Sequence, residues 1–150
     1  MELLLGSHVL EHGNRVGRLA GFELEPAELR IRRLVISPSG ELGPQAVTRP
    51  LSMIATASGR TIDLGPPSDT SPLPAVADVA LLSRATRFIV DGASHGRLAG
   101  VEVDLPTRRV VSVFGREHWW SRRTAIPVAN VDLSTPGEIR VRRPEGTRAA

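Results

Sequence analysis

The strongest constraint on this chain is an internal repeat. The segment Gly17–Gly21, with the sequence Gly-Arg-Leu-Ala-Gly, recurs as Gly96–Gly100, 79 residues further on. Hydrophobic and glycine positions on both sides align as well. Among the aligned pairs are Gly13 with Gly92, Glu23 with Glu102, Ile31 with Val110 and, at an offset of 77 after a loop, Ile62 with Ile139. The chain is therefore expected to contain one small module in two copies.

Each copy is predicted to consist of short β-strands joined by turns, because no segment shows a sustained apolar period of 3.6 residues. The pairs Gly13–Asn14 and Asp91–Gly92 indicate hairpin turns, and Gly21 and Gly100 indicate bends within strands. The expected strands are Val9–Leu10, Leu19–Leu24, Leu29–Ile36, Val47–Ile54, Arg60–Leu64, Phe88–Val90, Leu98–Val103, Arg109–Phe114, Ala125–Val131 and Glu138–Arg142. This pattern predicts an all-β fold of two small antiparallel β-barrels in tandem, with minor helical turns.

The two copies are separated by a proline-rich joint. Residues 1–64 form the first repeat, residues 65–83 a linker, residues 84–143 the second repeat and residues 144–150 a flexible tail. Four prolines between Gly65 and Pro74 predict an extended, semi-rigid linker. We expect a short helix over Ala75–Ser83 and single helical turns after Pro50 and Pro127, since proline suits the first helical position.

Composition excludes several kinds of chemistry. The chain has no cysteine, and all 19 of its basic residues are arginine. Disulfides, cysteine-based metal sites, thiol nucleophiles and catalytic lysines are therefore excluded. The N-terminal segment Met1–Gly6 has no basic region and too short an apolar run for a signal peptide, so a cytoplasmic protein without a membrane span is expected.

The positive charge lies in the second repeat. Residues 1–64 have a net charge of 0, residues 65–83 of −2 and residues 84–150 of +5. A basic half of this size favours anionic partners.

Several motifs of the chain resemble the PRC-barrel family. They are Leu4–Val9, Gly13–Leu19, Leu34–Ile36 and Arg49–Leu51 in the first copy, and Asp91–Gly92, His95–Leu98, Asp104–Val110 and Ala125–Val128 in the second. The resemblance implies two compact β-barrels. It also implies docking onto other macromolecules, as in the reaction-centre H subunit and the ribosome maturation factor RimM. It implies no catalytic residues.

The residues themselves give little support for an enzyme or for a bound cofactor or metal. His8 and His12 have a metal-ligand spacing only on a helix, and here they flank a predicted turn. Gly17–Gly21 lacks a complete dinucleotide-binding pattern, and no serine lies in a nucleophile motif. We therefore expect no catalytic, cofactor-binding or metal-binding residues.

One segment of the second repeat is a candidate interaction surface. Residues 116–123 contain both tryptophans of the chain among arginines, the composition of a protein-binding hot spot and also of an RNA-binding surface. The alternative is that both tryptophans pack, one inside the barrel and one across the interface between the two copies. The candidate residues are Arg116, His118, Trp119, Trp120, Arg122 and Arg123.

The sequence thus predicts a non-enzymatic adaptor or assembly module that mediates protein–protein interaction. The partner is expected to be another protein or a second copy of this chain in a homodimer. The alternative is an RNA- or ribosome-associated protein that uses the basic second repeat.

Overall fold

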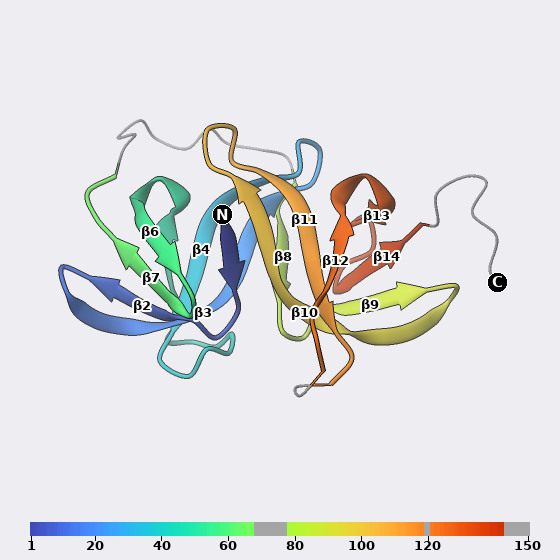
Figure 1. Ribbon diagram of the computed structural model, residues 1–150, viewed down its shortest axis with the longest axis horizontal. Coiled ribbons are helices and arrows are strands. Elements are labelled where there is room, and N and C mark those ends of the chain that lie inside the picture. The colour runs from blue at the N-terminus through green and yellow to red at the C-terminus, as the bar shows by residue number, and fades with distance from the viewer. Residues whose placement is uncertain (68–77, 119–120, 143–150) are drawn as a thin grey trace.

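The computed structural model describes residues 1–67, 78–118 and 121–142, and their regular secondary structure is almost entirely β-strand (Figure 1). The all-β prediction is confirmed. The first repeat contributes β2 (His8–Glu11), β3 (Asn14–Glu25), β4 (Arg30–Ser37), β5 (Val47–Pro50), β6 (Ile54–Ser58) and β7 (Thr61–Leu64). The second contributes β9 (Arg87–Val90), β10 (Ala93–Asp104), β11 (Arg109–Arg116), β12 (Thr124–Pro127), β13 (Val131–Asp132) and β14 (Glu138–Val141).

The two repeats have the same strand pairing. In the first, β7 pairs with β2 in parallel, and β2, β3, β4 and β5 follow in antiparallel order. In the second, β14 pairs with β9 in parallel, and β9 to β12 follow in the same way. The main path of the sheet runs from β13 to β6 through both repeats, and within the described residues the hydrogen-bonded strands do not close into a ring.

Tight turns join the first strands of each repeat. The turn residues His12 and Gly13 both have positive φ, as do Asp91 and Gly92. Positive φ at both central residues is what a type I′ hairpin requires. The second turn lies where it was predicted, whereas the first lies one residue earlier than the expected Gly13–Asn14.

The helical predictions are confirmed in part. Short 3₁₀ turns follow the two prolines, at Leu51–Met53 (η1) and Val128–Asn130 (η2), and η1 divides the expected strand Val47–Ile54 into β5 and β6. The helix expected over Ala75–Ser83 is wrong for its described end, because Ala80–Ser83 forms strand β8. The apolar run Ala-Leu-Leu has no period that separates helix from strand, and pairing with β3 decides its conformation.

The repeats exchange their first strands. β1 (Glu2–Leu4), at the start of the first repeat, pairs with β10 of the second, and β8, just before the second repeat, pairs with β3 of the first. The two pairings have the same register at an offset of 79 residues: Leu4 lies opposite Gly100, and Ser83 lies opposite Gly21. Each repeat is therefore completed by a strand that belongs to the other.

The second glycine of the repeated motif makes this exchange possible. A Cβ atom on Gly21 would lie 2.5 Å from the carbonyl oxygen of Leu82, and a Cβ on Gly100 would collide with the carbonyl oxygen of Leu3. β3 and β10 also have register shifts at these glycines, as the bends predicted from sequence require. The most conspicuous sequence match between the copies thus marks the places where exchanged strands pack closely.

The repeats meet at equivalent residues. Arg30 of β4 lies opposite Arg109 of β11, its counterpart 79 residues later. The amide of Ile31 donates to the carbonyl of Arg108 (2.9 Å), and the amide of Val110 donates to that of Leu29 (2.8 Å). Residue pairs related in this way are the signature of a two-fold arrangement, here formed within one chain.

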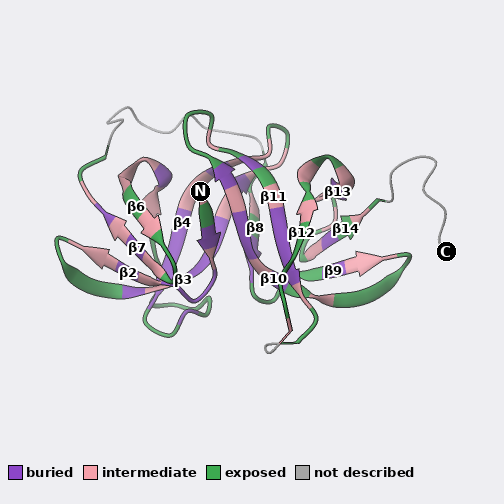
Figure 2. Ribbon diagram, in the orientation of Figure 1, coloured by how far each residue is buried: buried purple, intermediate pink, exposed green. Residues whose placement is uncertain are grey.

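A single hydrophobic core connects the two repeats, as the buried segments along the long central strands show (Figure 2). Leu3 of β1 and Leu82 of β8 belong to it, together with Phe22, Phe88 and Val101. A module of about 65 residues buries a small share of its surface when alone, so a shared core is a physical reason for the repeats to stay together. Within the described residues, no helix has the length and apolar character needed to cross a membrane.

Candidate functional site

The described residues of the segment identified from the sequence lie at the end of β11 and between β11 and β12. Arg116 is the last residue of β11. After it, the amide of His118 donates to the Ser121 hydroxyl (3.0 Å), and that hydroxyl donates back to the His118 carbonyl (2.7 Å). Trp119 and Trp120 lie outside the described residues, so their predicted role stays a prediction.

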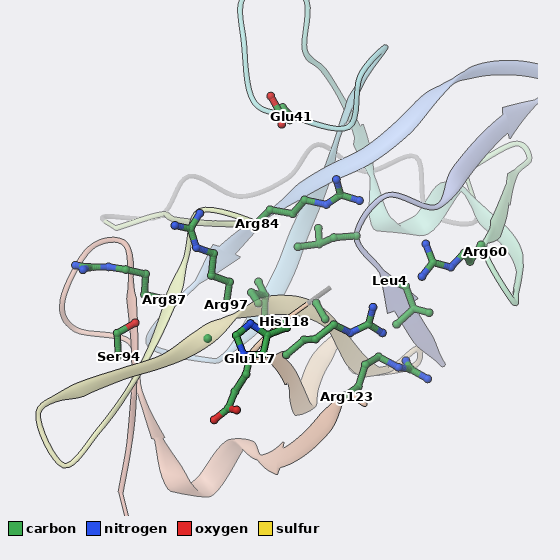
Figure 3. A pocket seen from close by; sticks show the side chains of 15 residues that line it. Leu4, Glu41, Arg60, Arg84, Arg87, Ser94, Arg97, Glu117, His118 and Arg123 are labelled. Carbon is green, nitrogen blue, oxygen red and sulfur yellow. The ribbon is translucent and has the colours of Figure 1, made fainter. Parts of the chain in front are cut away.

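A cavity of about 720 Å³ lies against this segment, and arginines dominate its lining (Figure 3). The arginines are Arg60, Arg84, Arg87, Arg97, Arg116 and Arg123. Arg116, Arg123 and His118 were predicted from sequence, and the structure brings them together here. Arg122 lies instead in a neighbouring hollow of about 260 Å³ that Arg116 also lines. Below, the larger cavity is called the arginine pocket.

Both repeats build the arginine pocket. Leu4 and Leu5 come from the N-terminal segment, Glu41 from the loop after β4, and Arg60 from the turn between β6 and β7. Arg84 follows β8, and the remaining arginines come from the second repeat. Sequence reasoning missed these first-repeat residues and Arg84, because only the strand exchange places β1 and the turn after β8 beside β10.

Three of the pocket arginines form no ion pair with an acidic side chain of the described residues. Arg87 pairs with Glu138 at 3.2 Å, and Arg123 pairs with Glu2 at 3.5 Å while lying over the Phe114 ring. In residues 1–67, 78–118 and 121–142, by contrast, no carboxylate forms an ion pair with Arg60, Arg84 or Arg97. Their guanidinium groups are therefore uncompensated cations that face a concave space.

The guanidinium group of Arg84 lies against Gly6 of the first repeat. Gly6 has φ = +85°, and a Cβ atom there would collide with the Arg84 guanidinium. Figure 3 shows the side chains of Arg84 and Arg60 extending toward each other from opposite sides of the pocket. A glycine turn in the first repeat thus lies beside a cation from the start of the second.

The equivalent position in the first repeat is filled. Ser37, the counterpart of Arg116, is buried, and its hydroxyl accepts a hydrogen bond from the Gly40 amide (2.9 Å). Gly40 has positive φ and lies against the Arg18 side chain, the counterpart of Arg97. His8 is the counterpart of Arg87, and the positive charge of Arg15 lowers the pKa of His8, with smaller effects from desolvation and from Arg18. In the first repeat, Ser37 and Gly40 therefore occupy the place beside Arg18, whereas the residues that correspond to Gly40 and Glu41 lie outside the described part of the second repeat.

The described part of the chain contains no group of three or more His, Asp or Glu side chains that could hold a metal ion. His95 lies 3.7 Å from Glu117, but both side chains are at least half exposed. The chemistry the arginine pocket offers is the binding of anions by guanidinium groups.

Neither the protein-family models nor the curated proteins include a match to this chain.

Proposed function

We propose that this protein is a non-enzymatic adaptor that holds an acidic segment of a partner protein in the arginine pocket. The observation that carries the proposal is the group of uncompensated arginines in a cavity built by both repeats. Guanidinium groups bind carboxylates through charge-assisted, often bidentate hydrogen bonds, which are stronger than neutral ones. The volume of the pocket, about 720 Å³, lies within the range of small-ligand sites and suits a few residues of a peptide.

The second part of the proposal concerns the fold family of the chain. We propose a tandem PRC-barrel-like protein in which core side chains and the exchanged strands close each curved sheet. The repeated motifs, the equal strand order of the two repeats and their shared hydrophobic core support this proposal. The resemblance implies docking without catalysis. The arginine pocket agrees with this role, because its most prominent feature is the positive charge of its arginines.

The form of the pocket favours a protein segment over RNA. Leu4, Leu5 and Leu98 give part of its lining an apolar character suited to side chains.

A labelled acidic peptide rich in Glu and Asp is expected to bind, and Arg84→Gln is expected to weaken that binding about ten- to hundredfold, because one charge-assisted hydrogen bond contributes roughly 1.5–3 kcal/mol. Fluorescence anisotropy measures the affinity at low and physiological salt. Arg15→Gln is the matched control, since Arg15 is exposed in the first-repeat hairpin and lies outside the pocket.

An equal loss of affinity in both variants would point to nonspecific attraction by net charge and would contradict the proposal. A single-stranded RNA of equal length serves as the competitor. If RNA binds more tightly than the peptide and Arg84→Gln weakens RNA binding most, the RNA-binding alternative replaces the adaptor.

Light scattering of the free protein at tens of micromolar measures its oligomeric state. It distinguishes a chain that forms a homodimer from a monomer whose partner is another protein.

A further inference from the structure

We propose that the hollow of about 260 Å³ beside the arginine pocket, called the apolar hollow below, holds one leucine-sized apolar side chain of the partner segment. This inference rests on the proposed function and adds a second feature by which the partner is recognised. It is drawn from the residues that line the hollow, from their counterparts in the first repeat and from the position of the hollow beside the arginine pocket.

The apolar hollow has an apolar wall built by three strands. Phe88 and Val90 come from β9, Gly115 from β11 and Ile126 from β12. Phe88 and Gly115 are buried, whereas Val90 and Ile126 are half-buried, and Ile126 packs against the core. Half-buried apolar side chains in a concave surface keep contact with water, which an apolar side chain from a partner would remove.

The corresponding place in the first repeat has a charged pair. Glu11 is the counterpart of Val90, and Arg49 is the counterpart of Ile126. The Nε atom of Arg49 lies 3.4 Å from a carboxylate oxygen of Glu11. The second repeat therefore has two apolar side chains where the first has an ion pair.

A core position also differs between the repeats. Gly115 corresponds to Ile36, which has no exposed surface. A Cβ atom on Gly115 would lie 3.2 Å from the Phe88 ring, and Phe88 corresponds to the smaller Val9. The second repeat thus has an aromatic ring and a bare backbone at the apolar wall, where the first repeat has two aliphatic side chains.

The apolar hollow adjoins the arginine pocket. Arg116 and Glu117 line both spaces, and the exposed Arg122 adds a positive charge at the hollow. A segment whose acidic side chains lie in the arginine pocket therefore places a neighbouring side chain in the hollow. An apolar anchor surrounded by polar and charged contacts is the usual composition of a binding hot spot.

The size of the apolar hollow selects the kind of ligand. Sites for free small molecules have volumes of roughly 300–1,000 Å³. The volume of about 260 Å³ lies below this range. It suits one side chain that is held in place by the rest of a bound segment.

Acidic peptides that carry a single leucine, moved from position to position along one sequence, test the inference by calorimetry. The reference is the same peptide with alanine at all of these positions. Each further buried carbon contributes a factor of about four in affinity, so the best leucine peptide should bind about ten- to fiftyfold more tightly than the alanine form. Its heat-capacity change on binding should be the more negative of the two, as burial of apolar surface requires.

The first repeat supplies the variant that should fill the hollow. The double change Val90→Glu with Ile126→Arg copies its ion pair without altering the net charge. This variant should bind the leucine and alanine peptides with nearly equal affinity. The matched control is the reverse change in the first repeat, Glu11→Val with Arg49→Ile, which should keep the preference for leucine.

A second variant is provided for the case that circular dichroism shows the double variant to be unfolded. Gly115→Ala adds one methyl group beside the Phe88 ring. It should lower the preference for leucine several-fold and leave the affinity for the alanine peptide unchanged.

The possible failures are distinguishable. Equal affinity of the alanine peptide and every leucine peptide overturns this inference and leaves the adaptor proposal standing. If no acidic peptide binds, both are wrong. A leucine preference that the variants of the hollow leave unchanged would place the apolar side chain elsewhere and would overturn the inference. If leucine raised the affinity only in Trp119→Ala or Trp120→Ala, the hollow would belong to a side chain of this protein, and the inference would again be wrong.

Discussion

A Leu3→Asp variant is expected to lose most of its folding stability, and to lose it first in the second repeat. Leu3 has no exposed surface, lies opposite Val101 of β10 and belongs to the shared core. The loss of a buried leucine side chain costs about 2–5 kcal/mol, and burial of an unpaired carboxylate adds several more. That total is comparable with the whole stability of a typical domain, roughly 5–15 kcal/mol.

The location of the damage distinguishes strand exchange from an ordinary tandem of repeats. In Leu3→Asp, amide protection against hydrogen exchange should disappear from β10 while β3 is affected less. Leu82→Asp, on the other exchanged strand, should show the reverse, because Leu82 lies opposite Phe22 of β3. Leu81→Asp is the matched control, since it makes the same chemical change on β8 at a side chain that is 46% exposed.

If Leu3→Asp reduced protection in β3 and left β10 intact, the first strand would belong to its own repeat and the exchange would be wrong. A Leu81→Asp variant as unstable as Leu82→Asp would show that any acid on β8 is damaging, and burial would then not be the cause.

Separation of the repeats is expected to have the second large effect. A fragment of residues 1–67 lacks β8, and a fragment of residues 78–150 lacks β1, so each exposes core residues along a sheet edge that is covered in the intact chain. Each fragment alone should be poorly folded, because a module of this size needs most of its buried surface. Mixed together, the fragments should form a one-to-one complex that shows the amide spectrum of the intact protein.

Size-exclusion chromatography with light scattering follows the assembly, and amide spectra follow the folding. The control is the intact chain under the same conditions. A fragment that is a folded monomer by itself would contradict the account, because it would show that neither repeat needs the strand of the other.

Local features of the fold could be predicted from sequence because short-range signals fix them. The Asp91–Gly92 turn and the helical turns after Pro50 and Pro127 follow from backbone preferences of glycine and proline. Turn chemistry is local, so no knowledge of the partner strand was needed.

The strand exchange could not be predicted in this way. Glu2–Leu4 and Ala80–Ser83 are too short to reveal a period, and a repeat gives the same pattern whether its first strand pairs within its own copy or with the other. The same reason limits the prediction of the site. Residues 116–123 were found as an arginine-rich segment, whereas Arg60 and Arg84 reach the pocket through long-range pairing that no local pattern records.

The most direct test of the account is to map where an acidic peptide binds. Amide chemical shifts of the isotope-labelled protein are recorded as an acidic peptide is added. The predicted result is a set of saturable shifts around the arginine pocket, at Arg84, Gly96, Arg97 and Leu98 of the second repeat and at Leu5 of the first, with none at the Gly13 hairpin. Shifts centred on another face of the molecule, with these residues unchanged, would contradict the claim that the junction of the two repeats is the binding site.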